Sequence, residues 1–251
     1  MAREEIRGLP PGQHALTGFP RFGSSRYAAR FPSDPDHVRL VVRQDGRTLT
    51  ELDSECWAKL PRRSQVSDFH CVTTWSSLGH RWDGVGFADF CSALGITVFD
   101  PTRLVVLRGG DGYHAALPLS DLLREDVLLA DRLDGEQLPL AHGAPLRLVA
   151  PAHYGYKSVK HLTAIEFDID PRSYRAPGPR FMIHPRARVD HEERGVGLPG
   201  GFLRFVYRPL IAPTAARFAR ALHARPKKAG QVNDPKSGAA SDPTPSPPAS
   251  R

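Results

Sequence analysis

Residues 69–90 read FHCVTTWSSLGHRWDGVGFADF. Cys71 stands near the end of the short stretch Asp68–Val72 and before a polar turn. This position predicts a side chain that projects into a pocket, whereas alternation along a strand points His70 to the opposite face. A lone cysteine beside a histidine is a common pattern, which also fits a residue with no chemical role. The stretch therefore makes Cys71 a candidate functional residue without specifying its chemistry.

Short aliphatic and β-branched runs lie on both sides of this stretch, each bounded by Gly, Pro or Asp, and they predict strands. They are HVRLVVR (37–43), RLVVLR (103–108), DVLLAD (126–131), PLRLVA (145–150) and HLTAIEF (161–167). Asp45-Gly46 and Asp134-Gly135 predict hairpin turns, because these residue types tolerate a positive φ. Short helices are predicted at Phe87–Leu94, from Asp53 and from Ser120. The 24 prolines and 22 glycines disfavour a helix bundle.

The chain of 251 residues has three cysteines, and no two of them show the CxxC spacing of a zinc or thioredoxin-type site. Cys56 and Cys91 fall at apolar positions of the predicted helices. We expect both to be inert core thiols, with Trp75 and Trp82 serving core or rim packing.

The net charge is +7. No Lys/Arg motif interleaved with aromatic residues accompanies this charge, so a nucleic-acid partner is not expected and an anionic small molecule or acidic partner explains it equally well. Residues 226–251 are predicted to be a disordered tail, because they contain almost no large apolar side chain. Residues 201–225 are predicted to be a basic amphipathic arm. It either packs on the domain or contacts a membrane surface or partner.

The N-terminus is acidic where a signal peptide is basic and lacks an apolar core, and no apolar run reaches the length of a membrane span. Cytoplasmic localisation is therefore expected.

The order of four segments resembles the molybdopterin-binding domain of the sulfite oxidase family, which includes bacterial methionine sulfoxide reductase catalytic subunits. The segments are FHCVTTWSSLGHRWDGVGFADF (69–90), GGDGYHAALPLSDLL (109–123), LADRLDGEQLPLAHGAPLRLVAP (129–151) and YGYKSVKHLTAIEF (154–167). The resemblance covers about half of the chain. It implies an α+β fold over residues 15–200, with a mixed β-sheet-rich, sulfite-oxidase-type architecture and short helices.

The resemblance also implies a site. Cys71 matches the family's molybdenum ligand and hence the catalytic position, and a soft thiolate suits a soft, redox-active metal. The cofactor's phosphate needs cationic side chains and backbone N–H donors. The matching positions are Gly109, His142, Arg147, Lys157, Ser158, Val159 and Lys160, with weaker candidates in Arg108 and in Phe19–Phe22. Without the resemblance, the preferred interpretation is that Arg147 lies on the exposed side of an edge strand and that Lys157 and Lys160 form a solvated face.

Departures from the family pattern leave the substrate open. Tyr174, His184 and Arg186 are candidates for the pocket or its rim, but the sulfite-binding arginine cluster cannot be traced. The resemblance implies two-electron oxygen-atom transfer on a small oxyanion or sulfoxide-like substrate, with a separate electron-transfer partner. Two alternatives stay open. One is a hydrolase or transferase in which Cys71 is a nucleophile activated by His80, His114 or His142. The other is a non-catalytic anion-binding module.

Overall fold

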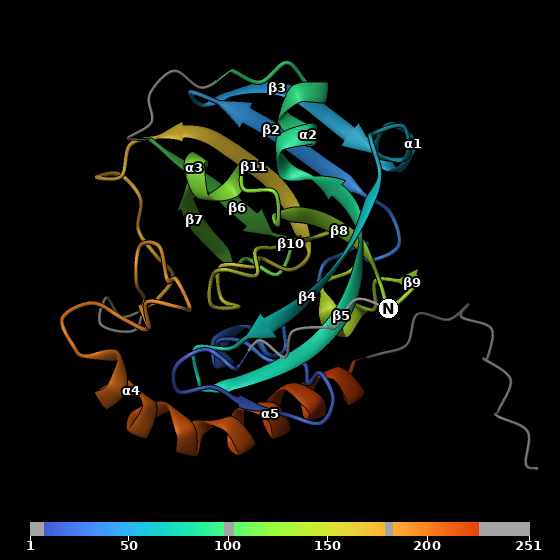
Figure 1. Ribbon diagram of the computed structural model, residues 1–251. Helices are drawn as coiled ribbons and strands as arrows, with labels where there is room; N and C mark the ends of the chain where they lie inside the picture. Colours follow the sequence, from blue (N-terminus) through green and yellow to red (C-terminus); the bar gives the residue numbers. More distant parts are fainter. Residues whose placement is uncertain (1–7, 98–102, 179–182, 226–251) are drawn as a thin grey trace, which may run out of the picture.

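A computed structural model describes residues 8–97, 103–178 and 183–225 of the chain. Its strands form two mixed sheets, and its helices are short apart from one near the C-terminus (Figure 1). The predicted α+β class, with mixed sheets and short helices, is confirmed.

The first sheet includes strands from residues 69–90, the segment on which the interpretation of the sequence depends. Its strands are β1 (His14–Ala15), β5 (Trp75–Gly86), β8 (Leu128–Leu133) and β10 (Arg147–Val149) in that order, with β4 (Arg63–His70) paired to β5 and β9 (Glu136–Gln137) to β8. β1 lies parallel to β5, and the other pairs are antiparallel. The predicted turn at Asp134-Gly135 joins β8 to β9, and both residues have a positive φ.

The second sheet has the order β3 (Arg47–Asp53), β2 (Arg39–Gln44), β11 (Leu162–Ile169), β6 (Leu104–Gly109) and β7 (His114–Pro118). Here β11 lies parallel to β2 while the remaining pairs are antiparallel. Asp45-Gly46 forms the predicted β2–β3 turn, again with positive φ at both residues. Inward side chains of both sheets, such as Val42, Leu107, Leu129 and Ile165, share one apolar core.

Short helices lie between the strands along the chain. They are α1 (Ser54–Ala58), α2 (Phe87–Ala93) and α3 (Leu119–Leu122), with 3-10 turns η1 (Ser25–Tyr27) and η2 (Leu140–His142). Cys91 on α2 is buried as predicted, and so are Trp75 and Trp82. The prediction for Cys56 is wrong, because this thiol is exposed. Trp57 takes the inward position on α1, and the preceding residue is turned about 100° around the helix axis.

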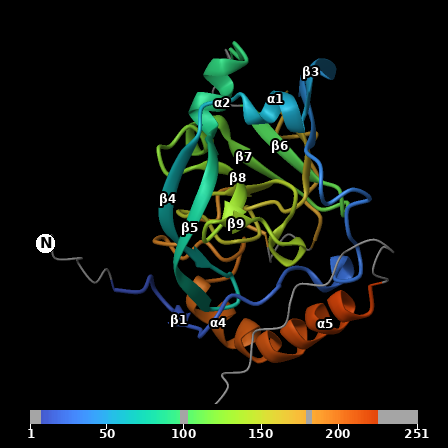
Figure 2. The same cartoon turned by 90° about the vertical axis from the view of Figure 1, so that its right-hand side faces the viewer.

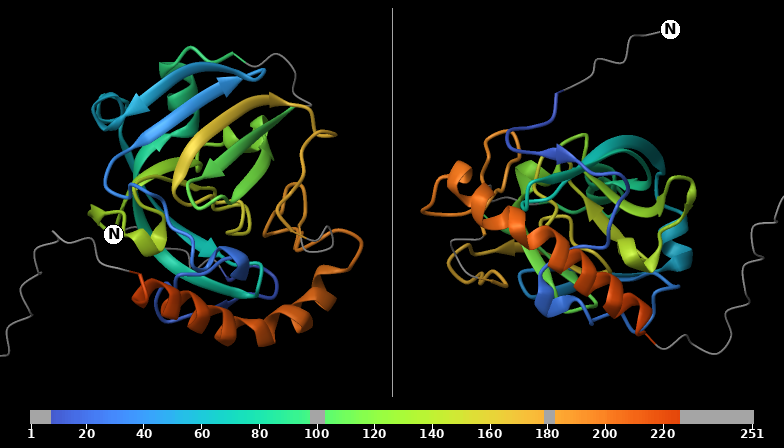
Figure 3. Two further views of the ribbon diagram at one scale, coloured as in Figure 1. Left: turned by 180° about the vertical axis from the view of Figure 1, so that it is seen from behind. Right: turned by 90° about the horizontal axis from the view of Figure 1, so that it is seen from below.

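The C-terminal part of the described chain is helical. α4 (Gly200–Tyr207), η4 (Arg208–Leu210) and α5 (Ile211–His223) follow one another along the lower edge of the molecule (Figures 1 and 2). Seen from below, they cross in front of the sheets (Figure 3). Leu203, Tyr207 and Phe218 are buried, so the predicted arm packs on the domain. The predicted disordered tail, 226–251, lies outside the described residues. None of the described helices has the length and apolarity to cross a bilayer.

Candidate functional site

Cys71 sits in a tight turn between β4 and β5. Its backbone N–H donates to the Trp75 carbonyl at 2.8 Å, and the Thr74 N–H donates back to the Cys71 carbonyl at 3.2 Å. Thr74 has a φ of +78°, a left-handed conformation that is costly for a β-branched residue. The surrounding structure therefore holds this turn against local backbone strain.

Side chains from distant segments fix the same turn. Gln13 donates its amide to the Cys71 carbonyl at 3.1 Å, and Arg194 donates to the Val72 carbonyl at 2.5 Å. The Cys71 sulfur lies 3.1 Å from the Thr73 hydroxyl. Burial raises the pKa of the Cys71 thiol, while the Thr73 hydrogen bonds and the positive charges of Arg194 and Lys160 act in the opposite direction.

Cys71 lines a cavity of about 300 Å³ between the sheets and the C-terminal helices. Most of the wall is apolar or aromatic, from Phe22, Tyr27, Phe69, Tyr113, Tyr156, Tyr207 and Phe218. The polar part of the wall has two cationic side chains, Arg21 and Lys160, one carboxylate, Asp111, and His161, together with the hydroxyls of Ser24, Ser25, Thr73, Ser158 and Thr214. Two of the residues predicted from the resemblance, Ser158 and Lys160, thus share this cavity with Cys71.

The cavity cations have carbonyl partners. Lys160 donates to the carbonyls of Phe22 and Ala141 at 3.3 and 3.1 Å. Burial, and then the neighbouring Arg147 and Arg21, lower the pKa of Lys160 well below its usual value. Arg21 donates to the carbonyls of Ala28 and Phe218 at 2.7 and 3.3 Å.

Arg147 lies behind the cavity wall and is fully buried. Its guanidinium donates to the carbonyls of His142, Leu148 and Ser158. It also stands 5.4 Å from the centre of the Phe69 ring. Burial lowers its pKa to about 9. Lys157 is likewise buried, and its ammonium donates to the carbonyls of Ala116 and Pro185, outside the cavity lining.

These four cations share one property. Within the described residues, Arg21, Arg147, Lys157 and Lys160 donate to carbonyls and stand in none of the ion pairs. Asp111 also lines the cavity and attracts Arg21 and Lys160 from beyond ion-pair distance. One carboxylate does not balance the positive charges of Arg21, Arg147 and Lys160, and burying uncompensated charge is costly, so the arrangement favours an anion. A metal-containing ligand that carries a phosphate fits this combination of groups, with the Cys71 thiolate as a ligand of the metal and the cations near the phosphate.

The other predicted residues lie around the cavity without lining it. His142 stacks on Phe19, with ring centroids 4.3 Å apart, and burial lowers its pKa to about 3. Val159 belongs to the apolar core. A side chain at Gly109 would overlap the Lys160 carbonyl, so glycine is required for this close approach.

The weaker candidates have other partners. Arg186 pairs with Asp121, His184 with Glu193, and Arg108 with Glu166. Tyr174 packs edge-on against His114. Of Phe19–Phe22, Arg21 and Phe22 reach the cavity.

Sequence reasoning missed Arg194 and the helical part of the wall. Arg194 is fully buried, stacks over Tyr154 at 4.9 Å and pairs with Glu192 at 3.1 Å. It lies 122 residues from the Val72 carbonyl that it binds, and no local motif marks it. Asp111 and Tyr113 stand in a quoted segment, so their sequence signal was present but unassigned.

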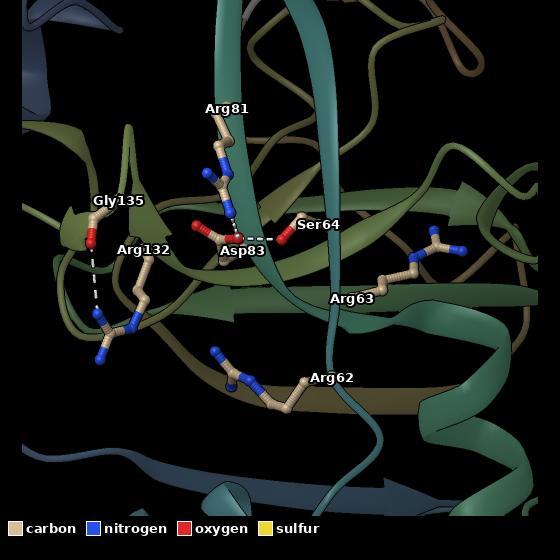
Figure 4. A pocket seen from close by; sticks show the side chains of 7 residues that line it. All are labelled: Arg62, Arg63, Ser64, Arg81, Asp83, Arg132 and Gly135. Atoms are coloured by element: carbon tan, nitrogen blue, oxygen red, sulfur yellow. Dashed lines mark hydrogen bonds and ion pairs between the residues drawn. The ribbon is translucent and has the colours of Figure 1, made fainter.

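A second cavity, of about 350 Å³, opens on the sheet of β4, β5 and β8 (Figure 4). Arg62, Arg63, Arg81 and Arg132 line it around Asp83, and Arg63 points away from the other three. Arg62 makes two 2.6 Å bonds to Asp131, and Arg81 lies 3.5 Å from Asp83. This pocket contains no thiol. Arg62 and Arg81 lie beside acidic residues, Arg132 is exposed, and Arg63 donates to the backbone carbonyls of Glu125 and Val127. The Cys71 cavity is therefore the stronger candidate.

Comparison with known proteins assigns the same segments to a known family. The oxidoreductase molybdopterin binding domain matches residues 28–174, more than half of the chain. The oxidoreductase YuiH of Bacillus subtilis is 32% identical over 168 residues, which are 63% of this chain and 78% of that protein.

Two further relatives are longer proteins. One, from Azospira oryzae, is named as a protein-methionine-sulfoxide reductase subunit, YedZ1. It is 31% identical over 50% of this chain and 45% of its own length. The mitochondrial sulfite oxidase of Drosophila melanogaster is 32% identical over 41% of this chain and 20% of its own length. This chain therefore spans less than half of either relative.

The match begins before β2, ends after β11 and includes Cys71 together with Arg147 and Lys160. It agrees with the resemblance drawn from the four sequence segments. The chain belongs to the family of oxidoreductase molybdopterin-binding domains, and it is a molybdenum-cofactor-dependent oxidoreductase of the sulfite oxidase type.

Proposed function

We propose that this oxidoreductase transfers an oxygen atom to or from a small, sulfur-containing substrate, with Cys71 as the protein ligand of molybdenum. The proposal rests mainly on one observation: the Cys71 thiol faces a cavity whose buried cations, Arg21 and Lys160, form no ion pair among the described residues and outnumber the one carboxylate of the lining, Asp111. When bound, the cofactor supplies a metal that changes oxidation state by two electrons and an open coordination position.

The chain's own groups have distinct tasks in this proposal. Cys71 binds as the thiolate, because only the deprotonated sulfur is a good metal ligand. The Thr73 hydroxyl at 3.1 Å and the positive charges of Arg194 and Lys160 favour this charged form. The aromatic wall excludes bulk water, which strengthens the electrostatic interactions inside.

The cations would hold the anionic end of the cofactor. Lys160 and Arg21 line the cavity directly, and Ser158 stands beside Lys160. Arg147 supports the wall from behind. We include the remaining residues implied by the resemblance, Gly109, His142, Lys157 and Val159, because they surround this wall and shape it.

Sulfur as the reacting atom is supported by two relatives, one named for sulfite and one for methionine sulfoxide. We further propose that a separate protein exchanges electrons with the metal. One relative is named as a reductase subunit, which supports a partner of this kind.

The test is elemental analysis for molybdenum, with pterin fluorescence after denaturation, on protein purified anaerobically from a molybdenum-supplied host. Wild type should hold both near stoichiometry. Cys71→Ser should lose molybdenum while its circular dichroism spectrum is unchanged. Cys56→Ser is the matched control, because this thiol is exposed, and it should keep full metal content.

Two outcomes would overturn the proposal. Full molybdenum in Cys71→Ser would remove Cys71 as the ligand. Wild type without molybdenum or pterin, in a host shown to make the cofactor, would favour the thiol-nucleophile or anion-binding alternatives. If loss of Cys71 then abolished a measured hydrolase or transferase activity in metal-free protein, nucleophilic catalysis would replace the present proposal.

A further inference from the structure

The outer face of α4 is unusually apolar for a surface helix. Phe205 is 80% exposed and Phe202 is 55% exposed, and Val206 is also exposed. Spacings of three and four residues place Phe202, Phe205 and Val206 on one side of the helix. Leu203 and Tyr207 occupy the other side and are buried against the domain. Packing on the domain therefore does not account for the two phenylalanines.

Cationic side chains flank this apolar face. Arg208 follows it directly and is exposed, and Arg217 and Arg220 are exposed on α5. These two α5 arginines lie three residues apart, so they share a side of that helix, while Phe218 between them is buried. Residues 196–225 contain no aspartate or glutamate. The outward side of the helical segment thus combines exposed aromatic groups with positive charge alone.

We propose that the outer face of α4 and α5 docks on the surface of an anionic lipid membrane. Aromatic side chains insert at the boundary between headgroups and acyl chains, and arginines bind the lipid phosphates. A protein partner with an apolar groove would account for the phenylalanines. It would not by itself account for a surface segment of about thirty residues without an acidic residue. An anionic lipid surface accounts both for the exposed phenylalanines and for the lack of acidic residues.

The same helices also form part of the cavity wall. Tyr207, Leu210, Thr214 and Phe218 line the cavity from the inner side. In Figure 1 α4 and α5 run along the lower edge with the sheets above them, and in the view from below they lie in front of the sheets (Figure 3). Docking through this face brings the rim of the cofactor cavity next to the membrane. This inference stands on the surface of α4 and α5 and does not depend on the identity of the substrate.

Vesicle flotation with the full chain tests the proposal. Vesicles of phosphatidylcholine alone are compared with vesicles that also contain phosphatidylglycerol, at low and high salt. Wild type should bind the anionic vesicles, bind the neutral ones weakly, and lose affinity as salt screens the arginines. The double variant Phe202→Ser/Phe205→Ser should need about tenfold more lipid for half-maximal binding, since two exposed aromatic groups are lost without a change in charge.

The control is Leu49→Ser, which removes an exposed apolar side chain from β3 at the opposite end of the molecule (Figures 1 and 2). It should bind like wild type. Arg217→Gln/Arg220→Gln provides a second, charge-directed variant that should weaken binding mainly at low salt. Circular dichroism on each variant checks that the fold is retained.

Three results would each overturn the proposal. Wild type that does not float with anionic vesicles has no lipid-binding face. Equal flotation of wild type and Phe202→Ser/Phe205→Ser would mean that another basic part of the chain binds the lipid. A dimer in sedimentation that Phe202→Ser/Phe205→Ser dissociates, without lipid binding by wild type, would assign the face to a second copy of the chain.

Discussion

At the scale of single residues, Gly155 lines the cavity and lies against the Phe69 ring. A side chain at this position would overlap the Phe69 ring. We predict that Gly155→Ala lowers the free energy of unfolding by about 1–3 kcal/mol, because overpacking forces the ring or the backbone to move. Urea unfolding measures this change. Gly201→Ala is the control, since nothing lies within 4 Å of its added methyl group. It should leave stability unchanged or raise it by up to about 1 kcal/mol. A Gly155→Ala variant as stable as wild type would contradict the close approach.

His161 makes the stability of the fold sensitive to acid. Burial lowers its pKa to about 4, and the charges of Lys160, Arg21 and Arg147 act in the same direction, although its bond to the Ala144 carbonyl opposes them. The unfolded chain, with a pKa near its usual 6.5, therefore binds more protons between pH 6.5 and 4. Stability falls as pH drops through this range, by up to about 3 kcal/mol.

The variant His161→Asn removes the titrating ring and tolerates the left-handed backbone at this position, where φ is +55°. We predict a shallower decline of the free energy of unfolding between pH 6.5 and 4, measured by urea titration at a series of pH values. Part of the decline should remain, because burial lowers the pKa of His142 to about 3 in the same way. An unchanged slope would contradict a buried, neutral His161.

Residues of the site differ in how far local sequence could reveal them. Cys71, Ser158 and Lys160 stand in the motifs that carry the family resemblance, and they line one cavity. Lys157 stands in the same motif, yet its ammonium points to the carbonyls of Ala116 and Pro185. A motif predicts that a lysine is present but not which way a long side chain turns. Arg194 reaches the Cys71 turn only through the tertiary fold.

At the scale of elements, an ion network connects α4 to the Cys71 turn. Glu192 accepts from Arg194 at 3.1 Å and from the Arg204 guanidinium at 2.6 Å, and Arg194 in turn binds the Val72 carbonyl. Arg194 is fully buried. Removing the carboxylate charge would leave this buried cation without its opposite charge, which is the costly way to break an ion pair.

We therefore predict that Glu192→Gln lowers the free energy of unfolding by about 2–4 kcal/mol. We also expect faster trypsin cleavage at the arginines of α4 and α5, because the helices lose their attachment to Glu192. Urea unfolding and timed proteolysis measure the two effects. Glu55→Gln breaks the exposed pair with Lys59 and should change stability by less than about 0.5 kcal/mol. Equal effects of both substitutions would show that the network adds nothing beyond a surface pair.

Strands and turns could be predicted from the sequence where a single local residue pattern determines them. The two Asp-Gly turns and the strands β2, β6, β8, β10 and β11 follow from local residue patterns. The twelve-residue strand β5 was not predicted as one element, because its polar and glycine-rich sequence has little strand signal. Pairing with β1, β4 and β8 supplies what its composition lacks. The orientation of Cys56 depended on a helix phase that five residues cannot define.

At the scale of the whole molecule, the fold encloses more positive charge near the cavity than it neutralises. Lys160, Arg147 and Arg21 lie close enough that the two arginines lower the pKa of the lysine. In the proposed function the bound cofactor compensates this charge, so we expect folding and cofactor binding to be coupled. Protein made in a host without the cofactor should melt about 5–10 °C lower than loaded protein, which corresponds to roughly 3 kcal/mol for a ligand at a hundred times its Kd.

Substitution of Lys160 should change the melting temperature in opposite directions in cofactor-free and in cofactor-loaded protein. In cofactor-free protein, Lys160→Met removes a buried charge that repels its neighbours, and this gain offsets the loss of the bonds to the Phe22 and Ala141 carbonyls. The melting temperature should therefore stay level or rise by a few degrees, about 1 kcal/mol. In loaded protein the same change removes a partner of the cofactor, so both the melting temperature and the pterin content should fall. Differential scanning calorimetry on the four samples measures the effect. A drop of equal size in both forms would mean that Lys160 serves packing alone, and the charge of the cavity would then have no connection with the cofactor.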